Sequence, residues 1–444
     1  MKTPLKLLIR QVTYNLRGGF LTRPLAIALT LGVVGAALSW MEEANPAMGS
    51  WLPAVLFPSR SDPQVAQVIL AGIAASIMTV VSIVFAIMLM TLTLASMQFS
   101  PRIIVSFARD RVTQWTLGIF LGTFCYCTAA LPSARSLPHP FSPVVTVLGA
   151  MLLAVVCVGW LLFFIHHISY AISVSHIVDR IASETESMID EMMPWPRRNG
   201  RTAPAPVQYA WDTPVLSETS GYIRFVDRGR LVSLAKVHHV KLQVARRVGL
   251  FVPAGTPLLL VHKGDRLTPD IVEDLRGAID LGPSRTLQQD IDFGILQIVD
   301  IALKAISPAV NDPSTAISCV DQLSRILIRY LSKEPPESLL YDPPGVFRVQ
   351  IPWSSFDQLL TTAFEQIRLY SKSDVAVSLR MLRALGDIAV TTPALPSIRA
   401  SLCALGKRIV EGCSENLNEE EMHPLRVRLA ALEELTGVPA PGKI

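Results

Sequence analysis

The sequence predicts an α-helical membrane domain of four transmembrane helices, followed by a cytoplasmic part made of a small β-barrel and an α-helical bundle. Half of the 444 residues are hydrophobic and only 17% are charged, against about 25% charged in soluble domains. The charges are also unevenly divided. Residues 1–175 hold 10 basic and 4 acidic side chains, whereas residues 176–444 hold 30 and 32. The first part therefore suits a bilayer, and the second has the composition of a soluble domain.

Four stretches without Asp, Glu, Lys or Arg predict the spanning helices. A spanning helix needs roughly 20 mostly apolar residues, and a helix in a soluble core is rarely so long and so free of charge. The third stretch carries Gly118 and Gly122 at a spacing that lets helices pack closely. We expect a membrane domain over residues 21–180. The stretches cover 25–41, 63–101, 112–134 and 136–178.

Basic residues in the short loops predict the orientation. The amino-terminal arm has five basic residues and no acid, and the loop after the second stretch has three basic residues against one acid. Such loops stay on the cytoplasmic side, so we expect both termini there. A cleaved signal peptide is the alternative for the first stretch, but its leader would be unusually long. The net positive charge belongs to the membrane half, so we expect no nucleic-acid partner.

Residues 1–20 predict an amphipathic helix that lies in the headgroup region. Five apolar residues fall on one helical face and basic residues fall on the opposite face. A simple extension of the first span is the alternative. The apolar residues are Leu5, Leu8, Ile9, Val12 and Leu16.

The second stretch has a stripe of small and hydroxyl residues at mostly helical spacing. Such a stripe either lets helices pack closely or lines a hydrated path. The stretch is too long for one bilayer and ends near Arg102, where other arginines gather. In a ring of subunits these arginines would form a positive mouth. The candidate pore-lining residues are Ser76, Thr79, Ser82, Thr93, Ser96 and Arg102.

Residues 181–265 predict a helical extension, a linker and a small barrel. The segment 181–214 begins as a helix and becomes rich in Pro, Gly and Arg, which is typical of a linker. Over 215–265, alternating apolar residues around Gly249 and Gly255 predict short strands and tight turns. This pattern resembles half of a biotinyl/lipoyl-type barrel-sandwich. Such carriers present a lysine on a hairpin, whereas Lys263 follows the last expected strand. We therefore expect a structural or docking barrel without a cofactor.

Beyond Arg266 the pattern becomes helical and predicts a bundle over residues 266–444. Thr268 and Asp312 each precede a proline, and a capping residue followed by proline is typical of a helix start. A bundle of roughly 170 residues is large enough to have its own core.

Polar residues gather in the first part of this bundle. Asp290 and Asp292 would suit a divalent cation as an acidic pair, but acids at a helix start more often satisfy free N–H groups. We favour capping and expect no metal. Arg285 and Gln289 have no evident local role, so they lead the candidates for contact with a ligand or another subunit. The full set is Arg285, Gln289, Asp290, Asp292, Asp300, Asn311 and Asp312.

Separated motifs in the sequence resemble one known family. They read DLGPSRTLQQDIDFG at 280–294, ISPAVNDPSTA at 306–316 and LASMQFSPR at 94–102. Together they resemble the bacterial predicted membrane proteins grouped as domain of unknown function 2254, over nearly the whole chain. The resemblance implies a bacterial inner-membrane protein and assigns no reaction.

Two functions fit these patterns. No nucleophile elbow, P-loop, zinc motif or dinucleotide fingerprint occurs, so we do not expect an enzyme. No charge lies within the four stretches, which disfavours an ion-coupled transporter. We expect a homo-oligomeric channel in the lipid bilayer, gated by its cytoplasmic domain and by an ion or small-ligand effector. The alternative is a membrane-anchored scaffold or sensor that binds a cytoplasmic partner or small ligand.

Overall fold

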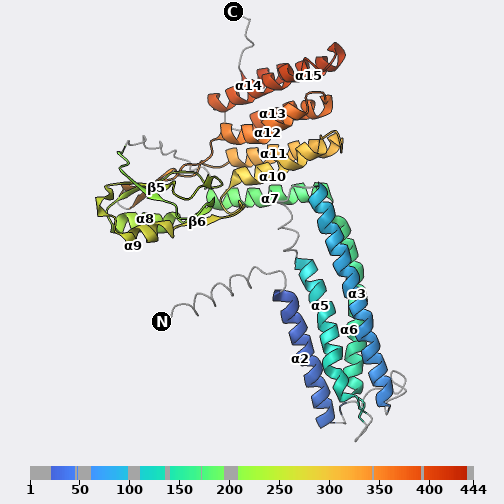
Figure 1. Cartoon of the computed structure of the whole chain (residues 1–444). Coiled ribbons are helices and arrows are strands. Elements are labelled where there is room, and N and C mark those ends of the chain that lie inside the picture. Colours follow the sequence, from blue (N-terminus) through green and yellow to red (C-terminus); the bar gives the residue numbers. More distant parts are fainter. Residues whose placement is uncertain are drawn as a thin grey trace, which may run out of the picture. The chain divides into compact units, whose positions relative to one another are not determined.

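The computed structural model describes residues 22–45, 48, 62–98, 111–135, 141–171, 173–194, 209–342, 345–391 and 395–437. The predicted interfacial helix over 1–20 and the pore candidate Arg102 lie outside these residues, as does most of the predicted linker. The chain divides into two compact units, Met1–Ser173 and Val174–Ile444. Long helices make up the described part of the first unit, and sheets with shorter helices make up the second (Figure 1).

The described part of the first unit contains four α-helices that are long and apolar enough to cross a membrane. Their outer surface is apolar. Leu29 is 68% exposed and Val155 is 70% exposed, as expected for side chains that face lipid. The helices are α2 (Thr22–Ala44), α3 (Pro63–Gln98), α5 (Arg111–Ala130) and α6 (Val144–Ala171).

Helix α5 packs closely against α2 because glycines lie at their contact. A Cβ at Gly118 would lie 2.6 Å from Cδ1 of Ile27, and a Cβ at Gly122 would overlap the side chain of Leu31. On α2, a Cβ at Gly35 would lie 2.7 Å from the carbonyl oxygen of Tyr126. The predicted close-packing pair on the third stretch therefore serves the contact between α5 and α2.

Helix α2 continues past its charge-free stretch and brings a carboxylate to the start of α6. Glu42 is only 3% exposed. It accepts hydrogen bonds from the backbone N–H groups of Val145 at 2.8 Å and Thr146 at 3.1 Å, and from the Thr146 hydroxyl at 3.0 Å. Glu42 thus satisfies N–H groups that the first turn of α6 leaves free. The neighbouring Glu43 pairs with Arg135.

The described part of the second unit contains two sheets. The five-stranded sheet has the order β1-β5-β3-β8-β7, and the three-stranded sheet has the order β4-β2-β6. The strands of the first sheet are β1 (Thr213–Leu216), β5 (Pro257–His262), β3 (Lys241–Val244), β8 (Val346–Gln350) and β7 (Leu339–Asp342). Those of the second are β4 (Phe251–Val252), β2 (Gly221–Val226) and β6 (Ile279–Gly282).

Both sheets are open, so the predicted closed barrel is not what the described residues form. Strand β8 pairs in parallel with β3, and β6 pairs with β2, so strands from beyond residue 265 extend both sheets. The expectation of helices alone after Arg266 is wrong at β6, β7 and β8. Directly after β2 the chain forms α8 (Arg228–Val237), which Asp227 caps by accepting a bond from the N–H of Arg230 at 2.9 Å.

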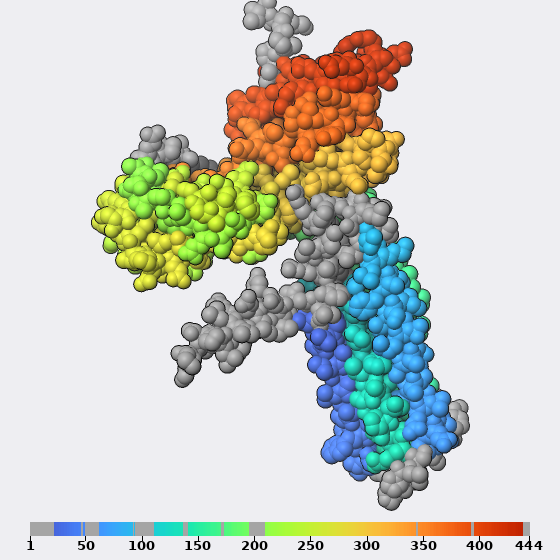
Figure 2. Space-filling model, in the orientation of Figure 1, coloured from blue at the N-terminus to red at the C-terminus, as the bar shows by residue number. Residues whose placement is uncertain are grey.

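Helices stack in layers through the rest of the second unit, beside the sheets (Figure 2). Helix α9 (Pro269–Arg276) belongs to the sheet region. The stack contains α7 (Val174–Met192), α10 (Ile291–Ala305), α11 (Pro313–Leu331), α12 (Phe356–Tyr370), α13 (Val375–Thr391), α14 (Pro396–Cys413) and α15 (Glu419–Thr436). Leu323, Phe364 and Leu385 are fully buried between the layers.

Helix α7 packs closely against α10 and forms ion pairs with α11. A Cβ at Gly294 of α10 would lie 2.9 Å from Cγ2 of Thr185, so the two helices approach closely there. Arg325 of α11 donates to Asp179 at 2.8 Å and to Glu186 at 2.5 Å. The acids of α7 therefore include partners for basic residues of α11.

Candidate functional site

The amino-terminal end of α10 is capped by an aspartate that also forms a buried ion pair. Oδ1 of Asp290 accepts a hydrogen bond from the N–H of Phe293 at 3.1 Å. The carboxylate also accepts two bonds from Arg285, from Nε at 2.7 Å and from Nη2 at 2.8 Å. Asp290 is 3% exposed. Burial raises the pKa of its carboxyl, and the bonds from Arg285 oppose that rise. The capping interpretation of Asp290 is confirmed.

Gln289 joins this helix start to the three-stranded sheet. Its Oε1 accepts a bond from the N–H of Val226 at 3.0 Å, and its Nε2 donates to the carbonyl of Val226 at 3.3 Å. The side chain therefore replaces a strand partner at the end of β2. Gln289 and Arg285 both have structural partners that the sequence did not reveal, and their contact with a ligand or subunit stays a prediction.

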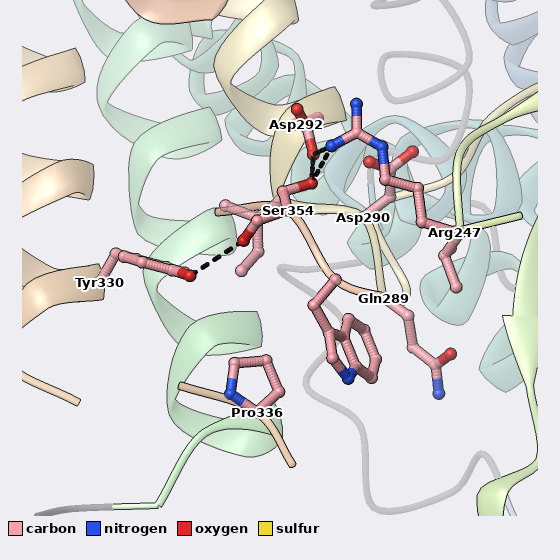
Figure 3. Close-up of a pocket in the computed structure, with 10 residues that line it drawn as sticks. Arg247, Gln289, Asp290, Asp292, Tyr330, Pro336 and Ser354 are labelled. Carbon is pink, nitrogen blue, oxygen red and sulfur yellow. Dashed lines mark hydrogen bonds and ion pairs between the residues drawn. The ribbon is translucent and has the colours of Figure 1, made fainter. Parts of the chain in front are cut away.

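A second arginine approaches the site from the loop between β3 and β4. Nη1 of Arg247 contacts Oδ2 of Asp292 at 3.4 Å and Oε1 of Gln358 at 3.3 Å, and it donates to the hydroxyl of Ser354. Ser354 in turn donates to Asp292, which is 5% exposed. Figure 3 shows Arg247, Ser354 and Asp292 converging, with Tyr330 bonded to the backbone of Ser354.

The loop that carries Arg247 lies directly against the ion pair of Asp290. Gly249 has a φ of +86°, in the left-handed region that favours glycine. A Cβ there would overlap the Asp290 carboxylate and would lie 2.8 Å from Nη2 of Arg285. Glycine at this position therefore satisfies both a backbone requirement and a packing requirement.

Residues of this cluster line two hollows. The smaller, about 20 Å³, has room for about one water. The larger, about 280 Å³, is close to the lower end of the roughly 300–1,000 Å³ of small-molecule sites. We call it the Arg247 pocket. Its polar lining comes from the loop between β3 and β4, the loop between β6 and α10, and helices α10 and α12. The polar lining residues are Arg247, Arg285, Asp292, Thr361, Thr362, Glu365 and Gln366.

Comparison with known proteins identifies the family. The family model described as "Predicted membrane protein (DUF2254)" matches residues 17–387. The chain belongs to the DUF2254 family. Among its relatives are the uncharacterized proteins Mb1321c of Mycobacterium bovis and Rv1290c of Mycobacterium tuberculosis, each 32% identical over 372 residues, which is 82% of this chain and 70% of theirs. No solved structure matches the chain. The family match confirms the resemblance seen in the sequence and includes every residue of the Arg247 pocket.

Other predicted site residues of this DUF2254 chain lie elsewhere. Asp312 caps α11, accepting bonds from the N–H of Thr315 at 3.1 Å and from its hydroxyl at 2.6 Å, and these bonds lower the pKa of Asp312. Asn311, with a φ of +48°, forms the turn before it. Helix α10 separates both from Asp290 by about 22 Å of helix. Asp300 lies within α10 and does not line the Arg247 pocket.

The candidate pore residues on α3 face outward in the single chain. Ser76, Thr79, Ser82 and Thr93 are exposed. The hydroxyls of Thr79, Ser82 and Thr93 donate to carbonyls one turn earlier at 3.2, 3.0 and 2.8 Å. The side chain of Ser96 and all of Arg102 lie outside the described residues. The pore-lining role therefore stays a prediction.

The sequence missed Arg247 and Ser354, which complete the site. They lie 45 and 62 residues from Asp292, and neither belongs to the motif that drew attention to α10. The glycine at 249 was noticed as a turn residue, but nothing local indicated which carboxylate it would contact. Across the described residues, no group of three or more His, Cys, Asp or Glu side chains is arranged to hold a metal ion.

Proposed function

We propose that this chain is a membrane-anchored sensor whose second unit binds a small ligand in the Arg247 pocket. The observation that carries the proposal is the convergence of polar groups from two loops and two helices on one hollow of about 280 Å³. A ligand there would contact the sheet region through Arg247 and the helical stack through Thr361 and Thr362. Binding would therefore change the contacts between the sheet region and the helical stack.

The second unit belongs in the cytoplasm of a bacterium under this proposal, below an inner membrane. The excess of basic residues in the amino-terminal arm and in the loop after α3 supports this orientation. A cytoplasmic ligand would then report on the metabolic state of the cell. Cysteine labelling with a membrane-impermeant reagent, first of intact and then of permeabilised spheroplasts, tests the orientation.

Thermal unfolding of the full chain in detergent tests the ligand-binding function. Amino acids, sugars, nucleotides, phosphorylated metabolites and polyamines form the panel. A ligand at 100 times its dissociation constant stabilises the folded state by about 2.7 kcal/mol, so at least one compound raises the unfolding temperature by several degrees.

Two variants show whether that shift comes from the pocket. Arg247→Ala abolishes it. Arg426→Ala, which removes an arginine from an exposed ion pair with Glu419 on α15, preserves it. The proposal fails if no compound in any class shifts the transition, or if Arg247→Ala leaves the shift intact.

One observation favours a second function, a homo-oligomeric channel. Outside α3 itself, none of the described residues lies within 4 Å of where a Cβ at Gly72, on the hydroxyl face of α3, would be. Other copies of the chain could cover this face and enclose a path. Native mass spectrometry and bilayer recording test it, and Thr79→Trp should alter the conductance. A monomer that conducts no current contradicts the channel.

A further inference from the structure

The free edges of two arginines in the Arg247 pocket indicate the chemistry of its ligand. We propose that the ligand carries an oxyanion, a phosphate or carboxylate, that binds the guanidinium groups of Arg247 and Arg285 together. The inference rests on the proposed ligand-binding function and names the class of ligand.

Arg247 uses only one of its three nitrogens in contacts with the residues that the structure describes. Its bonds to Asp292, Ser354 and Gln358 all involve Nη1, and neither Nε nor Nη2 donates to any described residue. Figure 3 shows one terminal nitrogen turned to Asp292 and Ser354 while the other points away from them. A guanidinium carries five N–H donors in a planar fork that matches the oxygens of phosphate and carboxylate. The unused edge of Arg247 is therefore a ready oxyanion donor.

Arg285, like Arg247, is held by protein contacts on one part of its guanidinium group. Its Nε and Nη2 bind Asp290, whereas Nη1 donates to no residue that the structure describes. The guanidinium lies 5.4 Å from the ring centroid of Phe293, and its side chain is 17% exposed. These contacts fix the direction of the free nitrogen, and a fixed donor loses little conformational entropy when it binds.

The charges around the pocket leave an excess of one positive charge. Glu365 also lines the hollow, but Arg368 at 2.5 Å and Arg408 at 3.1 Å pair with it. The charged residues that line the pocket, counted together with their ion-pair partners, are four arginines and three carboxylates. A ligand with one negative charge balances this set. The arginines are Arg247, Arg285, Arg368 and Arg408, and the acids are Asp290, Asp292 and Glu365.

The rest of the lining suits a small molecule attached to the oxyanion. The exposed hydroxyl of Thr361 and the amide of Gln366 supply polar contacts, while Leu250 and Leu296 provide an apolar wall. A soluble phosphorylated or carboxylated metabolite has this chemistry, and so does the headgroup of an anionic lipid. Both sources would present the same oxyanion to the same two arginines.

Substitutions of opposite charge at Thr361 test the inference without removing either arginine. Thr361 is exposed on α12, so neither Glu nor Lys disturbs the core. Isothermal titration of the full chain in phosphatidylcholine nanodiscs uses pyrophosphate and succinate as probes. Thr361→Glu should weaken binding of the tighter probe about tenfold, and Thr361→Lys should strengthen it severalfold, because a charge near the bound anion changes its energy in opposite directions.

Matched controls separate a local charge effect from a general one. Thr391→Glu and Thr391→Lys place the same charges at an exposed threonine of α13 that does not line the pocket, and they should leave the affinity unchanged. Arg247→Lys keeps the charge but loses the planar fork, and it should weaken binding. The inference is overturned if the two Thr361 variants shift affinity in the same direction, or if the Thr391 variants reproduce their effects.

The failure of this inference is distinguishable from failure of the proposed function. If neutral or cationic compounds bind in an Arg247-dependent way and neither anionic probe binds, the oxyanion is wrong and the sensor stands. If no compound of any charge binds, both are wrong. Nanodiscs that contain phosphatidylglycerol distinguish the sources. If an anionic lipid headgroup occupies the pocket, the soluble probe should bind the wild type more weakly in phosphatidylglycerol nanodiscs than in phosphatidylcholine nanodiscs. If the natural ligand is soluble, the affinity for the probe should be the same in both.

Discussion

The two units of this chain each bury a carboxylate at the start of a helix, and they satisfy it differently. In the membrane unit, Glu42 accepts three hydrogen bonds from the first turn of α6, all from neutral donors. In the second unit, Asp290 accepts one such bond and two from Arg285. Among the candidate spans, this carboxylate contact lies at a helix end and involves no cation. In the second unit, an arginine also enters the site.

Helices of both units also carry exposed valines. Val155 of α6 is 70% exposed on a candidate membrane span, and Val427 of α15 is 57% exposed on a helix that is not a candidate span. We therefore expect similar exposure to have different consequences in the two units, and substitutions at these two positions test that difference.

The largest expected difference comes from placing an acid at these two valines. Val155→Asp lies near the middle of α6 and costs about 3–4 kcal/mol of membrane insertion, so the protein should be lost from the membrane fraction. Val427→Asp should change stability by no more than about 0.5 kcal/mol. Fractionation and detergent melting curves measure both. Equal accumulation of the two variants in the membrane contradicts the assignment of α6 as a span.

The next effect concerns two glycines of the second unit. Gly249→Ala combines strain at positive φ with overlap on Asp290 and should cost about 3 kcal/mol. Gly255 has a similar φ of +80° but no atom within 4 Å of a Cβ, so Gly255→Ala should cost about 1 kcal/mol. Denaturant unfolding of the full chain measures both. Equal losses would mean that the Gly249 loop does not press on the ion pair.

The two units were not equally predictable from sequence. Four long charge-free stretches identify the spans because lipid excludes charge over a whole helix, and the effect is local. The caps at Asp290 and Asp312 are local too, since a cap depends on the next three residues. Strand β3, by contrast, pairs with β8 through Leu242 and Val349, and a period-two pattern gives no information about a partner about a hundred residues away. The barrel was expected for that reason.

The same limit applies to the candidate site. Arg285 and Gln289 stood out because no nearby residue explained them, and the structure shows that their partners are Asp290 and the backbone of Val226. Arg247 did not stand out, because it is one basic residue in an ordinary loop and its position depends on the fold. Sequence located one end of α10, and only the packed structure brings the second arginine there.

A smaller effect separates the two acids at the end of α2. Glu42→Ala leaves backbone donors of α6 without their partner and should lower stability in detergent by about 2 kcal/mol. Glu43→Ala removes a partly exposed pair with Arg135 and should cost about 0.5 kcal/mol. Melting temperatures of the two variants give the comparison. A larger loss of stability for Glu43→Ala than for Glu42→Ala would contradict the assignment of the buried contact to Glu42.

The smallest effect is a pH dependence in the second unit. Asp190 of α7 bonds Arg329 of α11 at 2.5 Å, and this bond lowers the pKa of Asp190 below its ordinary value of 3.8. Its contribution is therefore complete above pH 3.8 and is lost as the pH falls through the lowered value. The pair is partly exposed, so the contribution should be under about 1 kcal/mol. Asp190→Asn should narrow the stability difference between pH 5 and pH 3. An unchanged difference contradicts the pairing.

Hydrogen exchange of the full chain in nanodiscs, with and without pyrophosphate, tests the central claim most directly. The claim is that the Arg247 pocket is the functional site of the second unit. We expect slower exchange at residues 245–250 and in α12 when the anion is present, with no change in α2, α3, α5 and α6. Unchanged exchange in the loop and in α12 at saturating pyrophosphate, or a change confined to the membrane helices, contradicts it.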